Sequence, residues 1–136
     1  MTRLFIDTNV VLDFLMERAG YREAACIIDL STENDYELVV SVLSMSNIAY
    51  VLRKVLRGEN LYDALEQLSA FFKVASVTSE DFMGALELKS RDFEDALQYF
   101  CAKSYHCDRI VTRNEKDFYF SDIKVCSPVE FLSEIL

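Results

Sequence analysis

Short apolar runs alternate with longer amphipathic stretches along the chain. The runs are rich in aliphatic and β-branched residues and are strand-sized, so they predict buried strands at residues 3–6, 38–42, 74–77, 109–112 and 123–126. Between them apolar residues recur at helical spacing, as in Leu61, Leu65, Leu68 and Phe72. We expect helices at residues 10–17, 21–30, 61–71, 78–90 and 128–135, with a helical turn at 114–118. Two further helices are expected to start at residue 44, ending at the break formed by residues 58–60, and at residue 92.

Near-continuous apolar strands that alternate with helices are typical of α/β proteins whose parallel sheet is covered on both faces. The chain has one proline, three glycines and no linker or repeat, so we expect residues 1–136 to form a single domain. Ligands of such sheets bind beyond the carboxyl ends of the strands. The residues that follow each strand are therefore the candidates for a functional site.

The composition narrows the class of protein. Hydrophobic residues make up 51% of the chain and charged residues 27%, which argues against disorder. No apolar run approaches the roughly 20 residues of a membrane-spanning helix, and Asp7 interrupts the N-terminus before a signal peptide could form. We therefore expect a cytosolic protein without a membrane partner. The net charge of -9 argues against binding nucleic acid through bulk positive charge.

The cysteines do not suggest a metal or redox site. None of the four belongs to a C-x-x-C pair, and His106 is the only histidine available to complete a zinc site. Cys26 and Cys101 lie among apolar residues, so we interpret both as small core residues.

Acids and amides recur where strands end, at one predicted edge of the sheet. They are Asp7 after the first strand, Ser41 and Asn47 after the second, Asp92, Glu94 and Asp95 before the fourth, and Thr112, Asn114 and Asp117 after it. Clustered carboxylates repel one another unless a cation lies between them. Mg²⁺ and Mn²⁺ prefer oxygen ligands, and such an ion would also present positive charge locally on an acidic protein.

Each of these residues also has a purely structural interpretation. Asp7 could end a strand and cap the next helix, although its setting, an apolar strand followed at once by Thr8 and Asn9, favours a site. Thr8 and Asn9 can themselves cap that helix. Asp92 is a good helix N-cap, with Asp95 in the position of a capping box. Asn114 and Asp117 could form a polar turn. The functional signal lies in the combination.

That combination resembles the PIN-domain family of metal-dependent nucleases. The opening Leu4-Phe5-Ile6-Asp7-Thr8-Asn9 is similar to the family's first motif, Asp95-Ala96-Leu97 to its helix-heading acid, and Ile110-Val111-Thr112-Arg113-Asn114-Glu115-Lys116-Asp117-Phe118 to its "T-x-N/D…D-F" segment. The resemblance implies a three-layer α/β/α sandwich with a central parallel five-stranded sheet of order 3-2-1-4-5. It also implies an endoribonuclease that uses Mg²⁺ or Mn²⁺, and many relatives of this size are toxins held by a small antitoxin, often as homodimers.

Roles follow from the resemblance residue by residue. Asp7, Asp95 and Asp117 would bind the metal, with Asn114 as a fourth catalytic position. The expected surrounding residues are Thr8, Asn9, Asn47, Asp92, Thr112 and Arg53. Arg53, Lys54 and Arg57 form a small basic strip on the helix that carries Asn47, which is either a contact for RNA phosphates or a solvated face.

One departure matters for activity. The family commonly has a glutamate in the helix after the second strand, and here Asn47 takes that position, offering an oxygen but no charge. The sequence therefore predicts weakened metal binding that Asn47→Glu should restore, and leaves open an inactive PIN-like module that binds RNA or protein.

Two other phosphoryl-transfer classes fit less well. A haloacid-dehalogenase-like enzyme needs an acid where Asn9 stands. A receiver domain needs adjacent acids after the first strand and a lysine after the last strand, and the chain has neither.

Overall fold

A five-stranded parallel sheet forms the centre of the protein, which we describe over residues 1–136 from a computed structural model. The strands are β1 (Thr2–Ile6), β2 (Tyr36–Ser41), β3 (Lys73–Ala75), β4 (Arg109–Val111) and β5 (Lys124–Cys126). Their order is β3-β2-β1-β4-β5, and every neighbouring pair is parallel. This confirms the predicted sheet.

Helices connect the strands as the apolar spacing predicts. They are α1 (Thr8–Leu15), α2 (Tyr21–Asp29), α3 (Val42–Leu52), α4 (Glu59–Ser69), α5 (Ser79–Leu88), α6 (Phe93–Ser104) and α7 (Pro128–Ile135), with the 3-10 turns η1 (Leu30–Thr32) and η2 (Glu115–Phe118).

Polar side chains fix where these helices begin. Ser41, Thr78, Asp92 and Ser127 each accept a hydrogen bond from a backbone N–H in the first turn of the helix that follows. For α1 the cap is Asp7, whose carboxylate accepts from the Thr8 N–H. The alternative cap at Thr8-Asn9 is wrong, because both residues already lie inside the helix.

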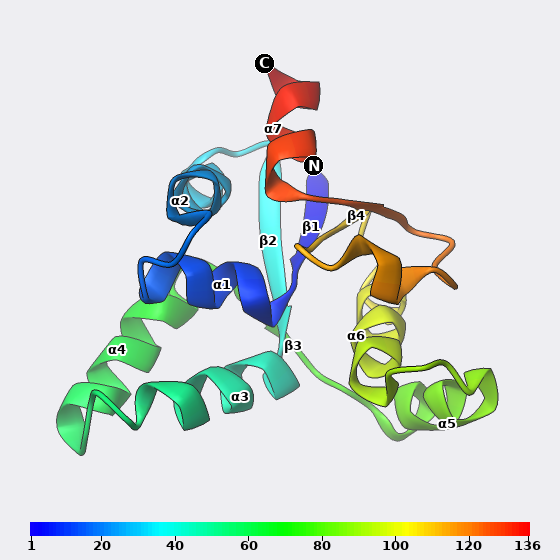
Figure 1. The fold of residues 1–136 in the computed structure, drawn as a ribbon, viewed down its shortest axis with the longest axis horizontal. Coiled ribbons are helices and arrows are strands. Elements are labelled where there is room, and N and C mark those ends of the chain that lie inside the picture. Colours follow the sequence, from blue (N-terminus) through cyan, green and yellow to red (C-terminus); the bar gives the residue numbers. More distant parts are fainter.

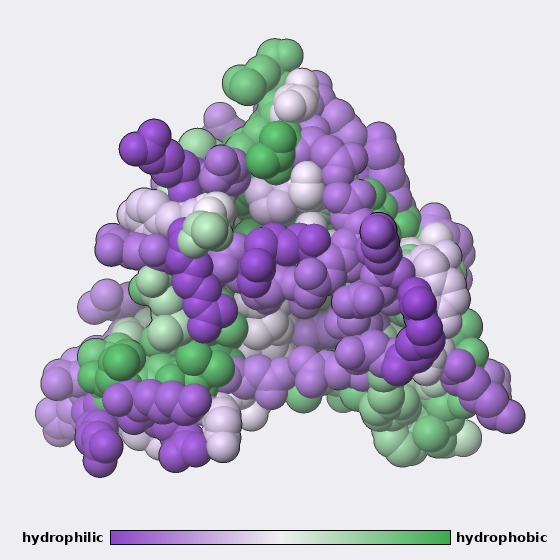
Figure 2. Space-filling view, in the orientation of Figure 1, coloured by the Kyte–Doolittle hydropathy of each residue, from purple (hydrophilic) through white to green (hydrophobic).

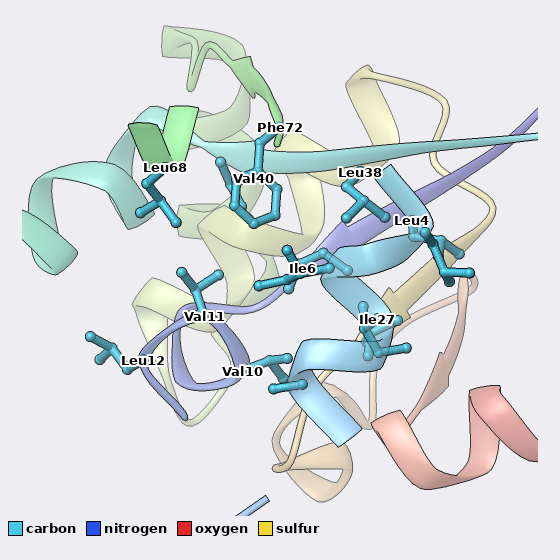
Figure 3. Close-up of a cluster of buried hydrophobic side chains, with 14 of the residues drawn as sticks. Leu4, Ile6, Val10, Val11, Leu12, Ile27, Leu38, Val40, Leu68 and Phe72 are labelled. Carbon is cyan, nitrogen blue, oxygen red and sulfur yellow. The ribbon is translucent and has the colours of Figure 1, made fainter. Parts of the chain in front are cut away.

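The strands are apolar on both faces because the sheet is covered on both. Leu4 and Ile6 of β1 join a cluster of 18 buried residues with side chains from α1, α2, α3, α4 and α7 (Figure 3). Phe5 points the other way, into a second cluster in which residues of the sheet pack against α6 and Phe118. Each fully buried aliphatic or aromatic side chain contributes about 1.5–3 kcal/mol. The result is the expected α/β/α arrangement.

One expectation about the core is wrong. Cys26 is exposed rather than buried, because α2 turns Ala24, Ile27 and Ile28 inward and leaves Cys26 on its outer side. Cys101 is buried as predicted, and all four cysteines are free. No helix is long and apolar enough to cross a membrane.

The basic strip also differs from expectation. Helix α3 ends at Leu52, so Arg53, Lys54 and Arg57 follow the helix and do not share one of its faces. The Arg53 guanidinium instead lies 4.0 Å from the centre of the Tyr50 ring.

The carboxyl ends of β1 and β2 point downward in Figure 1, toward the part of the molecule where α1, α3 and α6 begin. Figure 2 shows hydrophobic surface gathered over the α3/α4 corner and over α5, with hydrophilic surface between them.

Candidate active site

Asp7 is the most constrained polar residue at this edge. It follows β1 directly and is only 6% exposed. Its Oδ1 accepts a 2.8 Å hydrogen bond from the Thr8 N–H, while Oδ2 accepts from the Thr112 hydroxyl at 2.7 Å and from the Asn9 amide at 3.2 Å. Burial raises the pKa of Asp7, and the hydrogen bonds from Thr112 and Thr8 offset only part of that rise. The carboxylate is therefore both a helix cap and an oriented acid.

Thr112 and Asn9 connect Asp7 to the loop after β4. The Thr112 hydroxyl oxygen accepts a 3.0 Å hydrogen bond from the Asn114 N–H, and the side-chain Oδ1 of Asn9 accepts one of 3.4 Å from the Arg113 N–H. These contacts hold the start of η2 beside the end of β1. Asn114 and Asp117 themselves are exposed, and they line an open pocket with the residues between them.

The start of α6 supplies the next group of acids. Asp92 caps the helix by accepting a 3.0 Å hydrogen bond from the Asp95 N–H. A full capping box forms in α5 and α7 but not here, so the Asp95 carboxylate is not used as a cap. Burial, followed by the charges of Asp7, Asp92, Asp117 and Glu94, raises the pKa of Asp95 from 3.8 to about 7. The charges of Asp7 and Asp117 thus reach Asp95, and the metal-binding roles of these three acids stay predictions.

A buried polar network behind these acids was not predicted. Gln98 donates from Nε2 to the Ser44 hydroxyl oxygen at 2.7 Å and accepts at Oε1 from the Ser41 hydroxyl at 2.6 Å. The Thr8 hydroxyl donates to the same Ser44 oxygen at 2.7 Å. The network joins α6 to the starts of α1 and α3. Its only sequence signal is a glutamine one helical turn after Asp95 in an otherwise apolar stretch.

Asn47 faces an acid across the site. Its Nδ2 donates a 2.9 Å hydrogen bond to Oε1 of Glu94. Burial raises the pKa of Glu94, as do the charges of Asp92 and Asp7, while the hydrogen bond from Asn47 lowers it. The sequence identified the position of Asn47, but this pairing was not predicted.

Arg53 is the one predicted site residue that the structure does not bring to the acids. It stacks on Tyr50 beyond the end of α3 and forms no ion pair with a carboxylate of the site.

The donor chemistry fits a hard divalent cation. All candidate ligand atoms are oxygens, the kind that Mg²⁺ and Mn²⁺ prefer. Burial and repulsion between neighbouring acids disfavour the ionised carboxylates of Asp7 and Asp95 and raise their pKa values. A cation between them would relieve that repulsion. No three acidic, histidine or cysteine side chains are already placed to hold one ion between them. Asp117 is exposed and Asp95 is half-buried, whereas both oxygens of Asp7 already accept hydrogen bonds.

Comparisons with known proteins identify relatives of this chain. The PIN domain family model matches residues 3–116. Ribonuclease VapC1 from Aquifex aeolicus is 29% identical over 135 residues, covering 95% of this chain and 92% of its own. VapBC-1 from nontypeable Haemophilus influenzae has a TM-score of 0.73 at 18% identity, with 94% and 99% of the two chains covered. A toxin–antitoxin complex from Klebsiella pneumoniae has a TM-score of 0.71 at 18% identity, covering 92% and 97%. Since the family model spans most of the chain, including Asp7, Asp95 and Asn114, this protein belongs to the PIN domain family.

Proposed function

We propose that this protein is an endoribonuclease that uses Mg²⁺ or Mn²⁺ held by Asp7, Asp95 and Asp117. The observation that carries the proposal is that these acids come from three separate segments, the end of β1, the start of α6 and η2, and still influence one another: burial first, and then the charges of Asp7, Asp92 and Asp117, raise the pKa of Asp95 to about 7. The similarity to a curated ribonuclease supports RNA as the substrate.

The three acids differ in burial, and we assign them different roles in holding the ion. Asp7 is a fixed anchor because both of its oxygens accept hydrogen bonds. Asp95 is oriented by the N-terminus of α6, which Asp92 caps. Asp117 is exposed and reaches the site from η2. A bound Mg²⁺ or Mn²⁺ would lower the pKa of a water molecule and neutralise charge on the phosphodiester.

Asn114 and Lys116 are the best candidates for contacting the substrate. Both are exposed beside Asp117 in the pocket that η2 lines. The Asn114 amide can donate to a phosphate oxygen, and the Lys116 ammonium can pair with phosphate charge. Thr8, Asn9 and Thr112 keep Asp7 and this loop in position and need not contact RNA themselves.

The partners follow from the same family. The solved relatives include a VapBC assembly and a toxin–antitoxin complex, so we propose that a small antitoxin binds this chain and that the chain can form a homodimer. Exposed apolar side chains on α5, namely Phe82, Met83 and Leu86, provide surface that a partner can bury. Coexpression with the product of a neighbouring short reading frame, followed by mass measurement in solution, tests both assemblies.

Cleavage of RNA by the purified protein tests the activity. We expect cleavage with Mg²⁺ or Mn²⁺, none with a chelator, and none for Asp95→Asn. The matched control is Asp63→Asn, which makes the same change at an exposed position of α4. If the wild type is inert with both ions but still binds RNA or a protein partner, the chain is a non-catalytic PIN module, the function that Asn47 favours.

A further inference from the structure

We infer that Glu94 supplies a further carboxylate to the cation site and that Asn47 positions it. The inference rests on the proposed function, because it assigns one more residue to the same site. It also gives Asn47 a role other than that of a lost ligand.

The contact that carries the inference joins two elements across the site. Asn47 lies in α3 and Glu94 in the first turn of α6, and the 2.9 Å hydrogen bond between Nδ2 and Oε1 is the only one that the Glu94 side chain makes. The second carboxylate oxygen therefore has no partner within the chain. A glutamate at an exposed helix start would normally sample many rotamers, and this bond selects one of them.

The charges around Glu94 are unusual for a structural acid. No lysine or arginine forms an ion pair with it, and the charged groups that influence it are Asp92 and Asp7, both negative. The donor that holds Glu94 is a neutral amide, which does not cancel the charge of the carboxylate. The local negative charge is thus preserved, which favours cation binding.

This arrangement reverses the expectation from the sequence for Asn47→Glu. The new carboxylate would face Glu94 across a hydrogen-bond distance and would remove the donor that holds it. Two adjacent carboxylates repel, so the single substitution should not strengthen the site. Combining Asn47→Glu with Glu94→Gln exchanges the two groups and should restore a carboxylate with an amide partner.

Calorimetric titration of Mn²⁺ into four proteins tests the inference without relying on activity. They are the wild type, Glu94→Gln, Asn47→Glu, and the exchange variant Asn47→Glu/Glu94→Gln. We expect Glu94→Gln to weaken Mn²⁺ binding about tenfold and the exchange variant to recover most of that loss. Glu87→Gln, at an exposed position of α5, is the matched control and should bind like the wild type.

Two results separate the failure of this inference from the failure of the proposed function. If Glu94→Gln binds Mn²⁺ as tightly as the wild type while the wild type cleaves RNA, Glu94 has no part in the site and only the inference is overturned. If the wild type binds no Mn²⁺ and cleaves no RNA, the proposed function fails and the inference falls with it. Glu94 is exposed and makes one side-chain hydrogen bond, so Glu94→Gln should fold, and thermal unfolding checks this.

Discussion

The Thr112 hydroxyl donates a 2.7 Å hydrogen bond to Oδ2 of Asp7 and thereby joins the end of β4 to the end of β1. The same hydroxyl oxygen accepts the Asn114 N–H, so one side chain orients an acid and starts the loop that carries Asp117. Both atoms are buried, which makes this contact sensitive to substitution.

Thr112→Val tests that contact because it keeps the shape of the side chain and removes the hydroxyl. We expect the free energy of unfolding to fall by about 1–3 kcal/mol, since Asp7 loses a donor and the Asn114 N–H loses its acceptor. RNA cleavage should fall as well. Thr112→Ser retains the hydroxyl and is the control. Equal urea denaturation curves for Thr112→Val and the wild type would show that the bond contributes little.

Asp7→Asn and Asp95→Asn should have opposite effects on stability in a chelator at pH 8. Both oxygens of Asp7 accept hydrogen bonds. In Asp7→Asn the amide nitrogen would face a donor, either the Thr8 N–H or the Thr112 hydroxyl, and the free energy of unfolding should fall by about 1–3 kcal/mol. The Asp95 carboxylate accepts none, and burial and neighbouring acids oppose its charge, so Asp95→Asn should stabilise the fold by roughly 1 kcal/mol after allowance for its partial exposure. Urea denaturation measures both changes. The argument fails if the two substitutions move stability in the same direction.

The fold was predictable because its signals are local. The run from Leu4 to Ile6 is apolar without alternation since helices cover both faces of the sheet, and Ser127-Pro128 starts α7 with a capping side chain that can be read directly. Asp7 and Thr112 could also be placed near each other, because in a parallel sheet the residues after neighbouring strands meet at one edge.

The contacts between helices could not be predicted in the same way. The bond from Asn47 to Glu94 depends on how α3 lies against α6, and the Gln98 network depends on three elements meeting in the core. Neither distance is encoded in spacing along the chain. The burial of Cys26 was mispredicted for a similar reason. Apolar neighbours in the sequence do not determine which side of α2 faces the core.

Stability without metal should fall as the pH rises from about 4 to about 7. The pKa of Asp95 is raised from 3.8 to about 7, so within this window the folded protein binds more protons than the unfolded chain. The raised pKa values of Asp7 and Glu94 act with the same sign. Asp122, Glu130 and Glu134 have lowered pKa values, and their contribution belongs to more acidic solutions.

Urea denaturation between pH 5 and pH 8 in a chelator measures this dependence. Asp95→Asn should flatten the slope, and Mn²⁺ should restore stability above pH 7 because the ion binds only the folded, deprotonated site. A wild-type stability that rises steadily over this range would contradict the assignment.

Arg113 should matter for stability through Asp13, which lies beside the site and is only 2% exposed. The Arg113 guanidinium pairs with Oδ2 of Asp13 at 2.8 Å, and Oδ1 has no partner. Arg113→Ala would leave a buried carboxylate with neither charge nor hydrogen-bond compensation, and we expect a loss of about 1–3 kcal/mol. Arg91→Ala is the control, since Arg91 is exposed and stacks on Tyr119.

In the Asp13→Asn background the same Arg113→Ala change should lower the free energy of unfolding by less, because no buried charge is then left unpaired. A double-mutant cycle by urea denaturation measures the difference, and equal losses in both backgrounds would mean that the pair is not coupled.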